Sequence, residues 1–136
     1  MNHTTIQIET RGEGDIVDIT PQVKAAVSES GIKEGMVNVF VNGSTAAVTT
    51  IEYEPGVLSD LRRALSVLAP DNITYAHDSR WGDGNGRSHV KASLVGPSLS
   101  VPVTGGRPAL GTWQQVVVLE LDVRSTRTRS LIISVF

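Results

Sequence analysis

The sequence predicts an α+β fold with mostly antiparallel, β-sandwich-like sheets of about six or seven strands and two helices. Three observations favour this class. Short segments rich in β-branched residues recur along the chain between glycine-containing turns. Only two segments carry apolar residues at helical spacing. The length of 136 residues fits one domain, so we expect residues 1–136 to form a single unit.

The first 31 residues predict one strand and one helix. Residues 4–10 alternate polar and apolar side chains, as in a strand with one buried face. Thr20 followed by Pro21 is typical of a helix start, with threonine as the N-cap and proline in the first turn. Gly31 then suits a helix C-cap.

The middle of the chain predicts a β-hairpin and a second helix. Residues 36–41 are rich in valine and end at a strong turn signal, so we expect residues 42–44 to connect them to a strand over residues 45–51. In residues 57–68, leucine and valine recur on one helical face. This segment is the clearest helical pattern in the sequence.

Four further strands are expected in the second half of the chain. The apolar residues of 88–95 fit a half-buried strand, and residues 99–103 alternate up to a glycine turn that predicts another hairpin. Residues 114–122 are apolar on both faces near their middle, as in a central or interface strand. An apolar strand over residues 130–136 completes the prediction.

Composition limits the classes of partner. The chain has 12 basic and 14 acidic residues, a net charge of −2, which argues against a nucleic-acid partner. The absence of cysteine excludes disulfides and leaves the compartment open. The N-terminal residues lack a signal-peptide pattern and no apolar run is long enough to span a membrane, so we expect a cytoplasmic protein. Strands apolar on both faces in so small a domain leave surface to cover, which predicts a homo-oligomer.

Residues 75–97 carry the densest group of chemically active side chains. Three glycines in the segment 82–86 permit positive φ values and present Asp83 and Asn85 to a ligand. His77 and His89 flank this loop, and we expect His89 where the loop becomes a strand. The two histidines are candidates for metal ligands or for acid-base groups, although each could simply hydrogen-bond a loop carbonyl. Asp83 and Asn85 offer oxygen ligands suited to Mg²⁺, or ordinary turn chemistry.

Other polar residues are candidates for substrate binding. Ser44 and Thr45 at the expected hairpin tip could donate hydroxyl groups to a phosphate, or bond locally within the loop. Arg87 could hold a diphosphate. Trp113 and Gln114 could offer an aromatic face and an amide to a pyrimidine, or pack at a subunit contact. The remaining cluster of arginines is expected to be a solvated turn: Arg124, Arg127 and Arg129.

Several sequence blocks together resemble the YjbQ family of secondary thiamine-phosphate synthase-like proteins. The resemblance runs in the family's order over nearly the whole chain. DGNG, SHVKASLVGPS and LGTWQ are its most specific parts. The matching blocks are Asp18-Ile19-Thr20, Gly43-Ser44-Thr45-Ala46-Ala47, Glu52-Tyr53-Glu54-Pro55-Gly56 with Asp60, His77, residues 82–86, Ser88-His89, residues 94–98, Val101-Pro102 and residues 110–114.

This resemblance implies a compact β-rich trimer with a polar pocket near the subunit contacts. It also implies thiamine-phosphate synthesis, in which a pyrimidine methyl diphosphate is joined to a thiazole phosphate and pyrophosphate is released. One departure concerns Gly43, where many members have histidine, so a three-histidine metal site is not expected.

The leading hypothesis from the sequence is therefore a transferase of phosphorylated small molecules. His77, His89 and Asp83 are its expected catalytic residues and its expected ligands for a divalent metal, with Mg²⁺ favoured and Zn²⁺ as the alternative. Two other hypotheses use the same pocket. One is a non-catalytic module that binds a phosphorylated or metal-bound small molecule, and the other is a metal-dependent hydrolase with an open water position.

Overall fold

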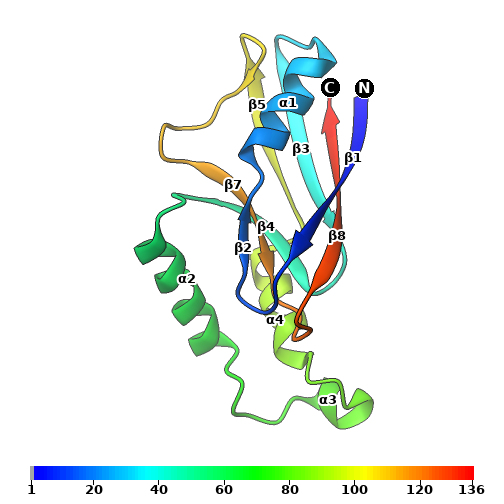
Figure 1. Cartoon of the computed structure of the whole chain (residues 1–136), viewed down its shortest axis with the longest axis vertical. Coiled ribbons are helices and arrows are strands. Elements are labelled where there is room, and N and C mark those ends of the chain that lie inside the picture. Colours follow the sequence, from blue (N-terminus) through cyan, green and yellow to red (C-terminus); the bar gives the residue numbers. More distant parts are fainter. Residues whose placement is uncertain (1) are drawn as a thin grey trace.

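The computed structural model describes residues 2–136 as two antiparallel sheets with four helices (Figure 1). The larger sheet has the order β1-β8-β3-β5-β6, with bounds β1 (Asn2–Thr10), β8 (Arg127–Val135), β3 (Gly35–Asn42), β5 (Ser98–Thr104) and β6 (Arg107–Pro108). The smaller sheet has the order β2-β7-β4, with bounds β2 (Ile16–Asp18), β7 (Gln115–Glu120) and β4 (Ala46–Ile51). The predicted α+β, sandwich-like class is confirmed.

The main hydrophobic core lies between the two sheets and under α1 (Thr20–Ser30). Alternate residues of each strand point into it, such as Val39 of β3 and Val118 of β7, which are fully or almost fully buried. α1 contributes Val23 and Val27, spaced one turn apart. This core relies on β-branched residues, which pack well on pleated surfaces.

A second, smaller core covers the outer face of the three-stranded sheet. The other alternate residues of β7, Val117 and Leu119, point into it. They meet Leu58 and Leu65 of α2 (Pro55–Leu68) and Ala92 of α4 (Gly86–Val95). β7 is thus buried on both faces, which confirms its prediction as a central strand.

The helix starts follow from local hydrogen bonds. The Glu54 side chain accepts bonds from the amides of Gly56 and Val57, both at 2.8 Å, and so caps α2. α1 begins at Thr20, whose hydroxyl oxygen accepts the Val116 amide at 2.9 Å instead of capping the helix. That bond ties α1 to β7.

Two local predictions were wrong. The residues 42–44 do not close a hairpin within one sheet, because β3 and β4 belong to different sheets and the chain crosses between them there. The segment 88–95 is the helix α4, not a strand. Together with the short α3 (Ala76–Trp81), it raises the number of helices to four.

α3 and the start of α4 form the end of the molecule opposite to the two chain termini (Figure 1). Among the described residues, no helix combines the length and the apolar character that crossing a bilayer requires.

Candidate functional site

The turn between α3 and α4 presents the predicted polar residues. Gly82, the C-cap that follows α3, has φ 70°, and Gly84 has φ 73°, so the expected positive φ values occur at both positions. The Asp83 carboxylate accepts the Asn85 amide at 3.1 Å, which stabilises the turn. α4 then begins at Gly86, where a Cβ atom would lie 2.5 Å from the Cβ of Tyr75. Glycine at this position therefore lets α4 approach the start of α3.

This turn brings two histidines and two aspartates together. Nδ1 of His77 lies 3.2 Å from an oxygen of Asp78 and 3.4 Å from an oxygen of Asp83. The ring of His89, on α4, lies 4.6 Å from the His77 ring between centroids. We refer to His77, Asp78, Asp83 and His89 as the His-Asp cluster. Of the three predicted metal ligands, His77 thus lies next to both Asp83 and His89, and the side chains of His77 and Asp83 are 31% and 47% exposed to solvent.

Asp78 is the member of the His-Asp cluster that the sequence analysis missed. Its carboxylate also accepts the Gly86 amide at 2.8 Å, so it joins the first turn of α3 to the first turn of α4. Desolvation raises its pKa, but the hydrogen bonds from His77 and Gly86 outweigh that effect and the net pKa is lowered. Asp78 is therefore ionised at neutral pH.

Asn85 lies beneath the turn and is 6% exposed. Its side-chain oxygen accepts the Ser88 hydroxyl at 2.8 Å and the Val123 amide at 3.0 Å, and its NH₂ group donates to Asp122 at 3.3 Å. Both the oxygen and the NH₂ group of this side chain thus bond other protein groups. Asn85 anchors the turn to the end of the small sheet, and none of its hydrogen bonds goes to His77 or His89.

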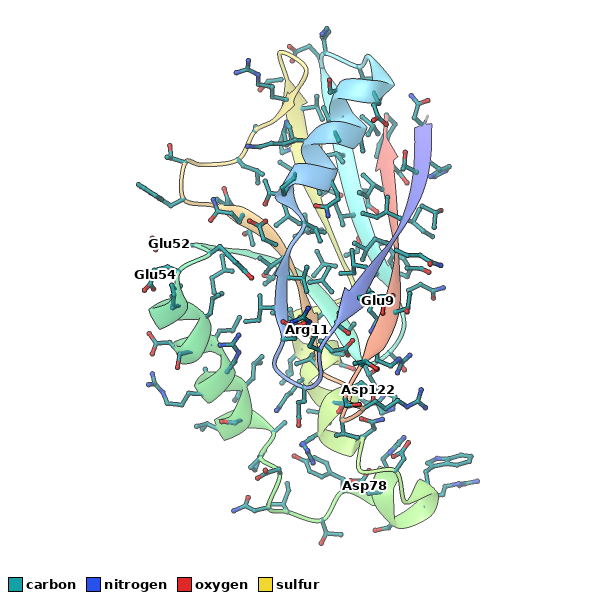
Figure 2. The ribbon with its side chains drawn as sticks, in the orientation of Figure 1. Glu9, Arg11, Glu52, Glu54, Asp78 and Asp122 are labelled. Carbon is teal, nitrogen blue, oxygen red and sulfur yellow. The ribbon has the colours of Figure 1, made fainter. Side chains whose placement is uncertain are left out.

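A buried polar network continues from Asn85 into the sandwich. Asp122 accepts the Thr45 hydroxyl at 3.0 Å and Arg127 at 2.6 Å. Arg129 is 2% exposed, and its guanidinium donates to Glu120 and to the Thr45 hydroxyl, the latter at 2.8 Å. Figure 2 shows Asp122 near the ends of the sheets and Asp78 farther out on α3.

Burial and hydrogen bonds act in opposite directions on the pKa values of the two carboxylates in this network. Desolvation raises the pKa of Glu120, but hydrogen bonds from Arg129 and Thr10 bring its net pKa below the ordinary value. Desolvation likewise acts on Asp122, and the bonds from the Arg124 amide and Thr45 reverse its effect. Both carboxylates are therefore ionised at neutral pH.

The prediction of a solvated arginine turn needs correction at Arg129. Arg124 is exposed, whereas Arg127 is half-buried against Asp122 and Arg129 is fully inside. The reason is the strand register, because β8 turns Arg129 inward to meet Glu120 of β7. Gly43 provides room for it, since a Cβ atom there would lie 2.8 Å from Nη1 of Arg129.

The predicted substrate-binding residues are spread over three places. Thr45 belongs to the buried network, while Ser44 is exposed beside it. Arg87 makes a two-pronged ion pair with Glu13, at 2.8 and 2.9 Å. Trp113 is 73% exposed in the loop before β7, where the neighbouring Gln114 bonds the Thr50 hydroxyl at 3.2 Å. The structure does not bring this loop into the His-Asp cluster.

The donor set of the His-Asp cluster fits a divalent metal ion. One ligand atom each from His77, Asp78 and Asp83 lies within 4.8 Å of the other two, and His89 offers a second imidazole nearby. Imidazole nitrogens together with carboxylate oxygens are donors that zinc and similar transition metals bind.

Comparison with known proteins places almost the whole chain in one family. The family model described as UPF0047 protein YjbQ-like matches residues 4–136. A UPF0047 protein of Methanocaldococcus jannaschii is 39% identical over 117 residues, which is 85% of this chain and 82% of the relative. The UPF0047 protein YugU of Bacillus subtilis is 36% identical over 126 residues, which is 91% of this chain and 92% of the relative.

Solved structures share the fold. A hypothetical protein of Aeropyrum pernix superposes with a TM-score of 0.88 at 28% identity, covering 100% of this chain and 98% of its own. A YjbQ/UPF0047 family protein of Clostridium acetobutylicum gives 0.84 at 34% identity, with coverages of 96% and 99%. A YbjQ-like protein of Sulfolobus solfataricus gives 0.83 at 32% identity, with coverages of 97% and 96%.

These comparisons overturn the prediction of thiamine-phosphate synthesis. The two relatives carry only the name UPF0047, and the Sulfolobus solfataricus structure is described as a protein of unknown function. The similarity therefore supports the family and the fold, and it gives no support to a synthase. The geometry of the site is the remaining guide to function.

Proposed function

The chain belongs to the UPF0047 family of YjbQ-like proteins, and on this premise we propose that it binds a divalent metal ion in the His-Asp cluster. One observation carries the proposal. Ligand atoms of His77, Asp78 and Asp83 lie within 4.8 Å of one another, beside the ring of His89. Such a group of imidazoles and carboxylates, partly open to solvent, is what a metal site with exchangeable positions requires.

The donor types favour zinc or a similar transition metal over the magnesium ion that the sequence favoured. Magnesium prefers oxygen ligands and retains several waters, whereas imidazole is a good zinc ligand. His77 and His89 would supply nitrogen, and Asp78 and Asp83 would supply oxygen. The bond from the Gly86 amide to Asp78 fixes one carboxylate beforehand.

Protons compete with a metal ion for the imidazoles, so binding should weaken as the pH falls. Nδ1 of His77 lies 3.2 Å from an oxygen of Asp78 and 3.4 Å from an oxygen of Asp83, so it faces the place where a shared ion would bind. Calorimetry of Zn²⁺ binding at several pH values measures the expected weakening.

Equilibrium dialysis with Zn²⁺, followed by metal analysis, tests the site itself. We expect about one zinc ion per chain for the wild type and a loss of at least tenfold in affinity for His77→Ala and Asp83→Asn. Asp60→Asn is the matched control, because Asp60 is an exposed aspartate paired with Arg63 on α2. Equal zinc binding by wild type and His77→Ala would refute the proposal.

We also propose that the metal-loaded site binds a phosphorylated small molecule. The exposure of His77 and Asp83 supports this, because a bound ion would remain accessible from solvent. Phosphate oxygens are suitable ligands for a divalent ion with open positions. Inorganic phosphate should bind the zinc-loaded protein more tightly than the chelator-treated protein, as measured by calorimetry. Equal affinity would contradict this part.

Assembly as a homotrimer is a further proposal, in line with the family resemblance. Support comes from apolar side chains that the isolated chain leaves in solvent, including Val67 at 74% and Leu94 at 60% exposure. Light scattering coupled to size-exclusion chromatography measures the mass. We expect three times 14.5 kDa, and a monomeric mass at all concentrations would contradict the proposal.

A cytoplasmic location stays a prediction. Fractionation of host cells that carry a tagged copy of the chain tests it. Recovery of the chain in the membrane fraction would contradict it.

A further inference from the structure

A second pocket lies on another side of α4, away from the proposed metal site. It has a volume of about 410 Å³, within the range of small-molecule sites. Its walls come from α2, from the outer face of the small sheet and from α4. The apolar part of the wall consists of Ile16, Leu61, Leu65, Leu119 and Leu121. The pocket therefore offers an apolar surface, which could cover the apolar part of a ligand, next to charged groups.

The charged end of the pocket is built around the Arg87 guanidinium. Nε and Nη2 of Arg87 donate to the two oxygens of Glu13, at 2.8 and 2.9 Å. This parallel geometry is the one in which arginine binds a carboxylate. Glu13 is thus a carboxylate of the protein itself that occupies Arg87, in a pocket whose wall also carries Arg62, Asp15 and Asp71.

Lys91 lies beside this pair with its charge incompletely satisfied. Its side chain is only 9% exposed, and its nearest acidic partner among the described residues is Glu13, at 3.6 Å. That distance is too long for a good hydrogen bond. The Lys91 nitrogen is not one of the buried side-chain atoms that lack a hydrogen-bond partner among the described residues, so it keeps contact with solvent. The position of Lys91 in the pocket wall therefore indicates room for a second anionic oxygen.

The helix geometry separates this pocket from the His-Asp cluster. Arg87 and Lys91 are four residues apart and share one face of α4, whereas His89 lies between them in sequence and points elsewhere. Neither His77 nor His89 lines the pocket. One helix thus presents a cationic face to the pocket and a histidine to the metal site.

Glu13 can leave the pocket without a change of the fold. It stands in a turn between Gly12 and Gly14, whose φ values are 93° and 91°. The turn backbone is held by two bonds. The Gly14 amide donates to the backbone carbonyl of Glu120, at 2.8 Å, and Arg62 donates to the Gly14 carbonyl, at 2.6 Å. Rotation of the Glu13 side chain alone would free Arg87 and Lys91.

We propose that this pocket binds a small organic carboxylate with an apolar body, and that Glu13 occupies the place of the ligand carboxylate in the free protein. Arg87 binds the carboxylate through two parallel hydrogen bonds, and Lys91 adds a second positive charge. The leucines of α2 and β7 cover the apolar body. Glu13 then acts as an internal competitor, which lowers the affinity for weak or abundant carboxylates.

Calorimetric titration with benzoate tests the proposal, with acetate as a probe that lacks an apolar body. Glu13→Gln removes the competing charge, and we expect it to bind benzoate at least tenfold more tightly than the wild type. In the Glu13→Gln background, Arg87→Lys should lose at least tenfold, because lysine cannot form the parallel bonds. Arg63→Gln in the same background is the matched control, since Arg63 is an exposed arginine of α2 outside the pocket.

Three outcomes would overturn the proposal. The first is benzoate affinity that is equal in the wild type and Glu13→Gln, or undetectable in both. The second is equal binding of acetate and benzoate, which would remove the apolar contact. The third is tighter binding of phenyl phosphate than of benzoate, which would exclude a carboxylate as the preferred group. Circular dichroism confirms that each variant is folded, and Arg87→Gln serves as a second variant if Arg87→Lys is not.

A variant of the proposed metal site keeps the two sites distinguishable. His77→Ala should bind benzoate as the wild type does, in the presence of a chelator. Loss of benzoate binding in His77→Ala would assign the ligand to the His-Asp cluster and refute the separate pocket.

Discussion

Two pairs of carboxylates in this protein have the same chemistry and opposite surroundings. Glu120 and Asp122 lie inside the sandwich, at 0% and 2% exposure. Arginines, threonine hydroxyls and backbone amides occupy their oxygens. Asp78 and Asp83 lie on the outer turn, with side chains 26% and 47% exposed. The oxygens of the inner pair accept hydrogen bonds from the protein itself, whereas the outer pair retains oxygens for a ligand.

The comparison teaches that the hydrogen-bond partners of a carboxylate decide its role in this protein, whether the residue is aspartate or glutamate. A buried carboxylate is tolerated only when nearly every lone pair has a donor, so the inner pair fixes geometry. An exposed carboxylate beside imidazoles contributes little to stability and can exchange its partners. Asn85 connects the two pairs, since its side-chain NH₂ group donates to Asp122 and its backbone N–H donates to Asp83.

The largest expected effect follows from breaking the inner pair. Arg129→Met leaves Glu120 buried and without its main partner, so the free energy of unfolding should fall by about 3–5 kcal/mol. Urea denaturation measures it. Arg63→Met is the control, because the Arg63–Asp60 pair is exposed and should contribute about 0–1 kcal/mol. A loss below about 1 kcal/mol for Arg129→Met would show that the buried network is not what holds the two sheets together.

Removing the connection between the pairs should have a smaller effect on stability and a clear effect on the metal site. Asn85→Ala leaves the Val123 amide and Ser88 without a partner, so we expect a loss of about 1–3 kcal/mol in urea denaturation. Zinc affinity should fall by about tenfold, because the turn is no longer held in place. Asn72→Ala, at an exposed asparagine, is the control. Unchanged zinc affinity in Asn85→Ala would mean that the turn keeps its shape without the anchor.

Acidification should affect the inner pair through its lowered pKa values. Glu120 and Asp122 have lower pKa values in the folded state than in the unfolded chain, so their contribution is present above the unfolded values, near pH 4. It is lost as the pH falls through the folded values. Urea midpoints should therefore stay level from pH 8 to 5 and drop below about pH 4, with a shallower drop in Glu120→Gln. An equally steep fall of the urea midpoint with pH in both proteins would mean that Glu120 does not cause the loss of stability in acid.

The smallest effect on stability is expected at the outer pair. Asp83→Asn keeps the acceptor oxygen that bonds the Asn85 amide, so unfolding should change by about 0.5 kcal/mol or less. The same change should weaken zinc binding by at least tenfold. A stability loss comparable to that of Arg129→Met would contradict the division between the two pairs.

The sequence predicted the sheets better than it predicted α4. β7 and α2 carry strong patterns, with branched residues on both faces in one and leucine at helical spacing in the other. In α4 the pattern misleads, because Val90 and Leu94 are exposed while Ser88 and Lys91 are buried. Apolar periodicity indicates the buried face only when apolar residues are the buried ones. Ser88 bonds Asn85, three residues before it, whereas the acidic partner of Lys91 is Glu13, far away in sequence, and no local rule reveals that second contact.

The site shows a similar division. His77, Asp83 and His89 could be grouped from the sequence, because a glycine-rich turn returns the chain on itself. The part of Asp78 could not be predicted, since it depends on the packing of α3 against α4, which places its carboxylate opposite the Gly86 amide. The sequence predicts a solvated position for Arg129, because only the register of β8 against its neighbours turns this side chain inward.

The central place of β8 also bears on how the chain is made. β1 pairs only with β8 in the described sheet, and β3 pairs with β8 on the other side. During vectorial synthesis on a ribosome, β1 and β3 emerge long before β8, so the strand that joins them is missing until β8 has been made. The larger sheet can therefore be completed only after β8 has left the exit tunnel. Until then, β1 remains an unpaired edge that a chaperone or a neighbouring nascent chain can contact.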